Sequence, residues 1–304
     1  MSDLIDPTAR PIPGMSRAAF VGLSSTAIAA AASIARALAD GTRLGAPHPP
    51  LVPEDDPAIT TTRPSLDRPG GDIDAYAAMP GGATASAPGV VVVQHVWGVD
   101  AQIRDVVRRF AKSGFIAIAP NLYARQHAPS GDGSTDYKVF GPFSKALVDD
   151  QVDGDLQAAA AWIRRTTMTG ASPNPSKVGL IGFCMGGTIA LRNTVRGPTY
   201  TAASVFYGKI RQSTSTGGTS SQPSLTYADA INMPLCGSWG ARDAGIPTAD
   251  VAALRDHLTR PNDLKIYDEA GHAFFDDTRP SYVAAAAADA WARTLQWFGK
   301  YLAG

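Results

Sequence analysis

The sequence predicts an α/β fold with a mostly parallel central sheet and helices on both of its faces. Short apolar runs alternate with segments of helical periodicity from residue 72 onward, which is typical of strands joined by crossover helices. One of the apolar runs, 89–96, is expected to be a strand in the middle of a parallel sheet. No internal repeat or break in composition follows residue 72, which favours one domain behind an N-terminal extension.

The individual elements follow from the spacing of apolar residues. Strands are expected at 58–63, 72–80, 89–96, 115–120, 177–183, 202–208, 233–240 and 263–270. Helices are expected at 101–114, 150–166, 188–195, 248–260 and 282–302. Two long polar loops, 121–145 and 209–230, separate some of these elements, and loops of this length commonly lie over a site. The expected solvent side of the helix 101–114 carries Arg104, Asp105, Arg108 and Lys112.

The chain is expected to divide into an N-terminal extension, 1–56, and one domain, 57–304. In the extension, a Pro-rich linker follows the segment 15–39, which has the layout of an export signal: Arg17, an uncharged stretch and a final Ala-Leu-Ala. This signal is degenerate, because a twin-arginine signal needs two arginines. The alternative is an Ala-rich helix packed on the domain surface. Both alternatives stay open, and with them a cytoplasmic or an exported (periplasmic) location, while the composition does not predict stable membrane insertion.

Charge and cysteine content narrow the function classes. Lys+Arg and Asp+Glu both number 27, and no block of one sign stands out, so neither nucleic acid nor an anionic membrane surface is an expected partner. The two cysteines, Cys184 and Cys236, cannot form a disulfide scaffold. Neither has a Cys-x-x-Cys partner or a nearby His cluster, so no metal site is expected. Cys236 lies in an expected buried strand, where core packing accounts for it.

A thiol stands at the tip of a tight turn. The stretch 182–186, Gly-Phe-Cys-Met-Gly, lies between an expected strand and an expected helix. This arrangement is typical of a sharp elbow, in which the nucleophile takes a strained conformation and its neighbours must be small. The N-terminus of the following helix would lower the pKa of Cys184, and the amide of Met185 would be an oxyanion donor. The alternative is a buried cysteine in an ordinary strand–helix turn.

Two further residues fit the elbow. In such a fold the acid and the histidine follow the nucleophile in the chain. Asp243 lies just after the strand 233–240, and His272 follows the strand 263–270. The alternatives are that Asp243 caps the next helix and that His272 is an ordinary loop histidine. The remaining histidines near the predicted elements fit less well, since they lie in the linker, in a polar loop and on an exposed helix face: His48, His127 and His257.

Several stretches resemble the dienelactone hydrolase (carboxymethylenebutenolidase) family of the α/β-hydrolase superfamily. The resemblance covers about residues 57–302 and rests on GFCMGG (182–187), GARDAGIP (240–247), AGHAFFDDTRPSYVAAAAADAW (270–291), VVVQHVWGV (91–99) and APNLYARQ (119–126). It implies an α/β-hydrolase fold and a triad of Cys184 as nucleophile, His272 as base and Asp243 as the residue that orients His272. It also implies an oxyanion hole formed by the amides of Val96 and Met185.

One departure from the family pattern concerns His95. Family members usually carry Glu at this position, in a stretch such as Gln-Glu-Ile-Phe-Gly, and this chain has Gln-His-Val-Trp-Gly. A carboxylate beside a thiol disfavours thiolate, whereas an imidazole can accept the proton and form an ion pair. His95 is therefore expected to raise the resting thiolate content of Cys184. The alternative is a satisfied polar group in the core.

A second departure concerns substrate charge. A family arginine that holds the substrate carboxylate lies four residues after the catalytic histidine, and this chain has Asp276 there. A second such arginine has no clear match in the loop 126–145, and Arg279 is nearby without being equivalent. The usual acidic dienelactone is therefore not the expected substrate.

The remaining candidates are aromatic. An apolar substrate pocket would draw on a set in which each member is equally suited to core packing: Trp97, Tyr123, Phe183, Tyr207, Phe274 and Phe275. No Gly-x-Gly-x-x-Gly follows a strand and no P-loop is present, so no cofactor is expected.

Three functions fit these features. The first is a cofactor-free hydrolase of a lactone or activated ester that works through a Cys-His-Asp triad and a thioester. The second is a lyase or isomerase on the same scaffold, with His95 and His272 as acid and base. The third is a catalytically silent binding protein, which an intact triad disfavours. The expected partner is a small lactone or ester, and the protein is expected to be a monomer or a small homo-oligomer.

Overall fold

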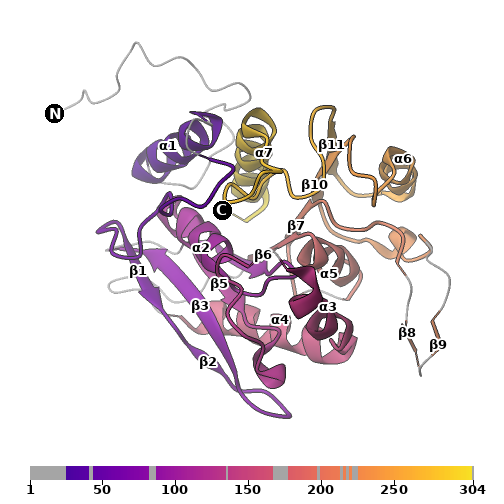
Figure 1. Cartoon of the computed structure of the whole chain (residues 1–304), viewed down its shortest axis with the longest axis horizontal. Helices are drawn as coiled ribbons and strands as arrows, with labels where there is room; N and C mark the ends of the chain where they lie inside the picture. Colours follow the sequence, from indigo (N-terminus) through magenta and orange to yellow (C-terminus); the bar gives the residue numbers. More distant parts are fainter. Residues whose placement is uncertain are drawn as a thin grey trace.

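The centre of the fold is a mixed, mostly parallel sheet. The computed structural model describes residues 25–40, 44–81, 87–134, 136–166, 177–196, 199–212, 215–216, 219–220 and 225–302. Within these residues, nine strands form one sheet in the order β1-β3-β5-β4-β6-β7-β10-β11, with β2 paired to β3 (Figure 1). Neighbours from β5 to β11 in this order pair in parallel, and β1, β2 and β3 add antiparallel pairs. The predicted fold class is confirmed.

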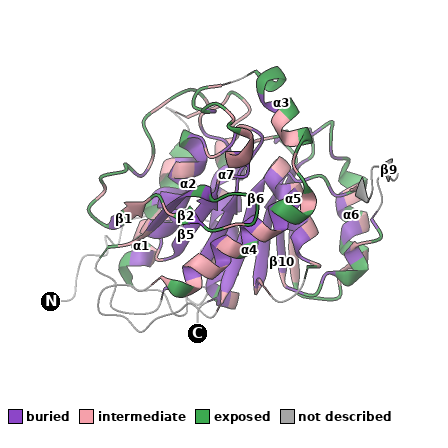
Figure 2. Cartoon of the chain, turned by 90° about the horizontal axis from the view of Figure 1, so that it is seen from below, coloured by how far each residue is buried: buried purple, intermediate pink, exposed green. Residues whose placement is uncertain are grey.

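The strands agree closely with the expected ranges. They are β1 (Ile59–Thr62), β2 (Ser65–Leu66), β3 (Ile73–Pro80), β4 (Gly89–Val93), β5 (Ile116–Pro120), β6 (Val178–Phe183), β7 (Ala202–Phe206), β10 (Leu235–Gly240) and β11 (Asn262–Tyr267). A separate short hairpin, β8 (Ser215–Thr216) with β9 (Thr219–Ser220), falls inside the loop expected at 209–230. The strand β4 is fully buried, as is typical of the middle of a parallel sheet. Figure 2 shows the labelled central strands β5, β6 and β10 in the colour of buried residues.

Helices cover both faces of the sheet. They are α1 (Ser25–Asp40), α2 (Ala101–Lys112), α3 (Tyr137–Lys145), α4 (Asp149–Arg165), α5 (Met185–Asn193), α6 (Thr248–His257) and α7 (Ala284–Leu302), with short turns η2 (Ala124–Gln126) and η3 (Ala228–Ala230). The crossover β4–α2–β5 runs along the sheet in one direction and β5–α4–β6 in the other, so right-handed connections put α2 and α4 on opposite faces. Helices α1 and α7 pack together beside α2 (Figure 1).

Two helices differ from their expected ranges. The segment 121–145 is not one loop, because α3 forms at its end with Asp136 as N-cap; Gly141 and Pro142 inside the helix made the segment look irregular. The helix after the elbow begins at Met185 rather than at 188, so Gly186 and Gly187 lie within α5. In both cases small or helix-breaking residues concealed a helix that tertiary contacts support.

Helix α2 is buried on more sides than its periodicity predicts. Asp105 and Arg108, expected on the solvent side, are both less than 5% exposed. The chain before β1 covers this side, since the backbone N–H groups of Leu51 and Val52 donate to the Asp105 carboxylate at 2.9 Å each. A segment distant in sequence therefore buries charges that a helix alone would expose.

The Ala-rich segment of the extension forms α1. Its buried residues Ala31, Ile34, Ala35 and Leu38 belong to the same hydrophobic core as the sheet, and the helix packs on α7. The first part of the signal-like segment, 15–24, lies outside the described residues, and the boundary at residue 57 stays a prediction. Of the helices in the described part of the chain, none combines the length and the apolar character needed to cross a membrane.

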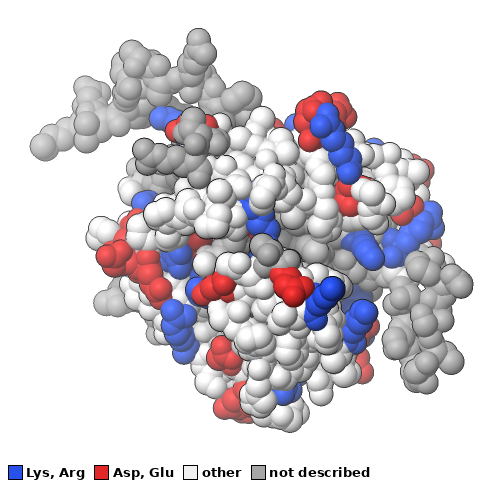
Figure 3. All heavy atoms as spheres, in the orientation of Figure 1, with Lys and Arg blue, Asp and Glu red and all other residues white. Residues whose placement is uncertain are grey.

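Charged side chains are mixed over the surface. On the face shown in Figure 3, acidic and basic groups are interspersed, and no broad patch of one sign covers that face. This distribution matches the balanced composition of the chain.

Candidate active site

The turn between β6 and α5 is a strained elbow. Cys184 lies at its tip with φ 55° and ψ −117°, a conformation that side-chain-bearing residues rarely adopt. A Cβ atom at Gly182 would lie 2.0 Å from the backbone oxygen of Gly186, and one at Gly186 would lie 2.4 Å from the backbone oxygen of Val93. Both positions therefore require glycine. The elbow leaves Cys184 half-buried at the carboxyl edge of the sheet.

Cys184, His272 and Asp243 lie in one chain of contacts. Nε2 of His272 is 3.0 Å from Sγ of Cys184, and its Nδ1 is 2.7 Å from Oδ2 of Asp243. The three residues follow β6, β11 and β10, so the carboxyl ends of parallel strands bring them together. Asp243 is buried, while the side chain of His272 is 42% exposed and open to a small molecule.

Cys184 and His272 change each other's protonation. Burial raises the pKa of the Cys184 thiol, but the hydrogen bond and charge of His272, with smaller contributions from the charge of His95 and the Met185 amide, together lower it by more, so the pKa lies below its ordinary value. Burial lowers the pKa of His272, but hydrogen bonds to Asp243 and Cys184 raise it to about 10. The pair therefore favours a thiolate beside an imidazolium.

One backbone amide faces the same sulfur. The N–H of Met185 donates a hydrogen bond to Cys184, and Val96 lines the cavity beside it. Tyr123 contacts both of these residues, because its hydroxyl lies 3.0 Å from the Val96 carbonyl oxygen and 3.4 Å from the Met185 sulfur. Tyr123 itself is buried and lines a different cavity of about 250 Å³.

His95 lines the active-site cavity from a buried position. Its Nδ1 accepts the N–H of Trp97 at 3.1 Å, and its Nε2 lies 3.2 Å from Oδ1 of Asp100. Burial lowers the pKa of His95, but the Asp100 carboxylate raises it by more. A proton on Nδ1 would point at the N–H of Trp97, and two donors cannot form a hydrogen bond. The ring can therefore become an imidazolium only if the Trp97 contact breaks. The amide contact favours a neutral ring with its proton on Nε2, whereas the Asp100 carboxylate favours the charged ring, and a charge on His95 lowers the pKa of the Cys184 thiol.

Asp276 and Arg279 form a paired wall of the cavity. Arg279 Nε donates to Asp276 Oδ2 at 2.8 Å, and its guanidinium carbon lies 4.5 Å from the centre of the Trp97 ring. Asp276 also accepts from the Thr278 hydroxyl at 2.6 Å. The carboxylate that replaces the family arginine is therefore largely neutralised within its own loop.

Two cavities meet at Cys184 and His272. The smaller, about 300 Å³, is walled by Trp97, Asp276 and Arg279. The larger, about 440 Å³, is lined by the apolar residues Leu147, Val152, Met185 and Ile189 and by the charged residues Asp149, Arg192 and Lys209, among others. Both cavities also touch Val96, Tyr137 and Tyr207. Volumes in this range suit a small organic ligand.

Apart from Tyr123, the aromatic candidates divide into two groups. Trp97 and Tyr207 line the cavities at Cys184. Phe183, Phe274 and Phe275 are fully buried instead, with Phe183 stacked on Phe275 at 5.4 Å between ring centres, and they pack the core behind the site.

Sequence reasoning missed several lining residues. Tyr137 at the start of α3 touches both cavities and is 55% exposed, and Lys209 lines the larger one. The length of the loops 121–145 and 209–230 was the available signal for these two residues. Asp100, which faces His95, gave no signal because it reads as an ordinary N-cap of α2.

Other reactive groups lie apart from this site. Cys236 is fully buried, and burial raises its pKa to about 12, in contrast to Cys184. In the described part of the chain, no group of three or more His, Cys, Asp or Glu residues is arranged to hold a metal ion.

Comparison with known proteins identifies the family of this chain. A model of the dienelactone hydrolase family matches residues 73–302. The protein named "Putative carboxymethylenebutenolidase" from Salmonella typhimurium is 35% identical over 256 residues, covering 83% of this chain and 92% of that protein. A protein of the same name from Synechocystis is 36% identical over 247 residues, covering 79% of this chain and 96% of that protein.

A solved structure shows the same fold. The crystal structure titled as a "Putative Dienelactone Hydrolase" from Klebsiella pneumoniae superposes with a TM-score of 0.70 at 34% identity, covering 80% of this chain and 100% of that chain. The part of the chain that carries all the candidate site residues therefore has both sequence and structural relatives.

Proposed function

Because this chain belongs to the dienelactone hydrolase family and is a hydrolase of carboxylic ester or lactone bonds, we propose that it cleaves them without a cofactor through a thioester on Cys184. The observation that carries the proposal is the contact chain Cys184–His272–Asp243, with distances of 3.0 and 2.7 Å. A thiol held by an imidazole that is oriented by a carboxylate is an activated nucleophile.

The reaction begins with the thiolate of Cys184 and the imidazolium of His272. The sulfur attacks the carbonyl carbon, and the carbonyl π electrons move to oxygen, where the amides of Val96 and Met185 donate hydrogen bonds. The oxyanion collapses, the ester C–O bond breaks, and His272 gives its proton to the departing oxygen. A thioester on Cys184 remains, with His272 neutral.

Water completes the cycle. His272 takes a proton from a water molecule, whose oxygen attacks the thioester carbonyl. The second tetrahedral intermediate collapses, the C–S bond breaks, and the acid leaves with Cys184 again a thiolate beside imidazolium. Asp243 holds Nδ1 throughout, which keeps Nε2 directed at the sulfur and stabilises the positive charge.

The two cavities indicate the substrate class. The carbonyl of an ester bound at Cys184 has an acyl side and an alcohol side, and cavities of about 300 and 440 Å³ meet at that point. A site of this shape suits an activated ester, or a lactone with a sizeable substituent, better than a small unsubstituted ring. Esters of an alcohol with a low pKa are favoured. The thiolate is itself a good leaving group, so when the alcohol is a poor leaving group the tetrahedral intermediate expels the thiolate and reverts to the substrate.

The lyase or isomerase alternative has no support in the comparisons. The hydrogen-bonding of His95 also argues against it as an acid–base partner, since Nδ1 is occupied by the Trp97 amide and Nε2 faces Asp100. His95 is better suited to support the backbone at Val96 and Trp97.

The test is a Cys184→Ala variant with an aryl ester and mass spectrometry. We expect turnover to fall to background while the circular dichroism spectrum is unchanged, and we expect the wild type, quenched in acid, to carry an acyl group on Cys184. Cys184→Ser should retain little activity, because the serine hydroxyl needs a stronger base than this site supplies. An Ala variant with full activity would refute the proposal.

A further inference from the structure

A strap from the N-terminal extension lies behind the active site. Residues 45–52 form this strap, which joins α1 to the segment before β1. It contacts the loop 272–279, here called the His272 loop, which carries the catalytic imidazole and the cavity residues Asp276 and Arg279. The strap and the loop are more than 200 residues apart in the chain, as the 229-residue separation of His48 and Asp277 shows.

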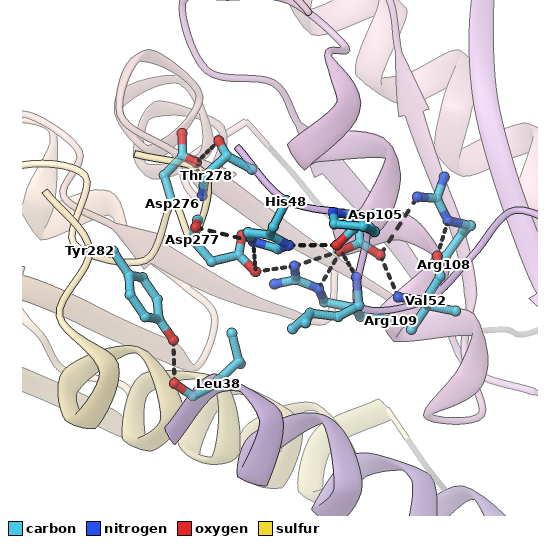
Figure 4. Close-up of polar contacts among 12 residues, drawn as sticks. Leu38, His48, Val52, Asp105, Arg108, Arg109, Asp276, Asp277, Thr278 and Tyr282 are labelled. Atoms are coloured by element: carbon cyan, nitrogen blue, oxygen red, sulfur yellow. Dashed lines mark hydrogen bonds and ion pairs between the residues drawn. The ribbon is translucent and has the colours of Figure 1, made fainter. Parts of the chain in front are cut away.

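The strap binds the backbone of the His272 loop at Asp277. The N–H of Gly45 donates to the Asp277 carbonyl oxygen at 2.7 Å, and Nε2 of His48 donates to the same oxygen at 3.1 Å. The same Nε2 lies 3.7 Å from the Asp277 carboxylate (Figure 4). Because a carbonyl oxygen only accepts, Nε2 of His48 carries the proton in this contact.

Helix α2 closes the same network from the other side. Its Asp105 accepts the backbone N–H groups of the strap at Leu51 and Val52, and it pairs with Arg109 at 2.6 Å. Arg109 also forms an ion pair with Asp277, and the side chains of Asp105, Arg109 and Asp277 are all at most 3% exposed. Figure 4 shows the strap, α2 and the His272 loop joined through these buried groups.

The front of the His272 loop needs such support. Ala273, directly after the imidazole, has φ 60°, a conformation that persists in a residue other than glycine only where its surroundings determine it. Asp277 faces the strap and α2, while its neighbour Asp276 binds Arg279 in the cavity wall. The loop is thus fixed at Asp277, five residues from the imidazole of His272.

We propose that the strap positions the His272 loop for catalysis and that His48 is a positioning residue of the active site. The inference rests on the proposed roles of Cys184 and His272. It means that the functional unit includes Gly45, although composition alone places the domain boundary at residue 57. A small displacement of the loop would lengthen the contact from Nε2 of His272 to the Cys184 sulfur, and such misplacements reduce rates strongly.

The experiment compares His48→Ala with His48→Gln in the full-length protein. The Gln side-chain amide places an N–H donor near the position of the imidazole Nε2, so it can restore the bond to the Asp277 carbonyl. Glu54→Gln is the control on the neighbouring chain, because Glu54 pairs only with the exposed Arg63 among the described contacts. The readouts are kcat, KM and the rate of iodoacetamide alkylation of Cys184 across pH 5–9.

We expect His48→Ala to lower kcat about tenfold with KM within about twofold of wild type. Its alkylation profile should move to higher pH, because a loosened imidazolium no longer lowers the thiol pKa. His48→Gln and Glu54→Gln should both resemble the wild type. Should His48→Ala fail to fold, His48→Asn replaces it, since the Asn amide is one methylene too short to reach the carbonyl.

Two results would overturn the inference. One is a folded His48→Ala protein with wild-type kcat and alkylation profile, even if its melting temperature is lower, because the strap would then be structural only. The other is an equal loss in the Gln and Ala variants. The alkylation rate is measured without substrate, so it tests the positioning role of His48 independently of the proposed reaction. A failure of the proposed reaction would appear instead as a fully active Cys184→Ala enzyme.

Discussion

Arg279 donates from Nε to Oδ2 of Asp276 at 2.8 Å, so the acidic residue in the cavity wall is neutralised by a neighbour three positions along the chain. The guanidinium also lies over the Trp97 ring and donates to the Ser134 carbonyl oxygen at 3.0 Å. Arg279 is thus held by the protein at Nε, at one terminal nitrogen and at the face of its guanidinium. The smaller cavity therefore presents neither a free cation nor an isolated carboxylate to a substrate.

Substrate charge is the first prediction that follows. Neutral aryl esters and neutral lactones should show higher kcat/KM than lactones bearing a carboxylate, because the smaller cavity has no unpaired cation to offset desolvation of the anion. Steady-state kinetics on a matched pair, a carboxylate-bearing lactone and its methyl ester, measures this. A preference for the acid would contradict it and point to Lys209 in the larger cavity, which Lys209→Met would then test.

The second prediction concerns the pH dependence of thiol reactivity. The hydrogen bond that His272 donates to Asp243 raises the pKa of His272, so Asp243→Asn should lower it, and the imidazole should lose its proton at lower pH. Without the imidazolium charge the Cys184 pKa rises. Alkylation at pH 6–7 should then slow about tenfold for each pKa unit gained by the thiol, and should approach the wild-type rate above pH 9. An unchanged profile would mean that Asp243 does not control the charge of His272.

The third prediction concerns His95 and has a matched control variant. His95→Glu puts a carboxylate near Cys184 and should raise the thiol pKa, which slows alkylation at pH 6 by about tenfold for each pKa unit. In His95→Asn, Oδ1 can accept the Trp97 N–H in place of Nδ1, so its alkylation rate should remain close to that of the wild type. The comparison is made with His272 present throughout. If Glu and wild type react equally from pH 5 to 9, His95 is purely structural.

The fourth prediction concerns Tyr137 and the selectivity between bulky and small esters. It touches both cavities at Cys184, and it is the most exposed of the residues they share. Tyr137→Ala should join the two cavities and raise kcat/KM for bulky aryl esters relative to acetate esters by about tenfold, the scale that a few methylene-sized contacts provide. Tyr137→Phe keeps the ring and should leave the ratio unchanged. An unaltered ratio in the Ala variant would show that Tyr137 does not separate the cavities.

Local chemistry explains what the sequence predicted well. Any side chain at position 182 or 186 would clash with backbone atoms, so both positions must be glycine and five residues are enough to predict the elbow. The strands of the parallel sheet are buried on both faces and appear as apolar runs, and chain order then indicates Asp243 and His272 as partners of Cys184. These features depend on short-range sterics and on topology, both of which the linear pattern carries.

The surroundings of the site depend on contacts between distant segments, which no local pattern contains. Asp105 and Arg108 have the spacing of an exposed helix face, and only the strap at 45–52 makes them buried. His95 was expected to act on the thiol, and the charge of His95 is among the causes that lower the pKa of Cys184, but only the tertiary structure shows that its ring nitrogens face the Trp97 amide and Asp100. The charge state and accessibility of a side chain follow from what folds against it, and this information exists only once the chain has packed.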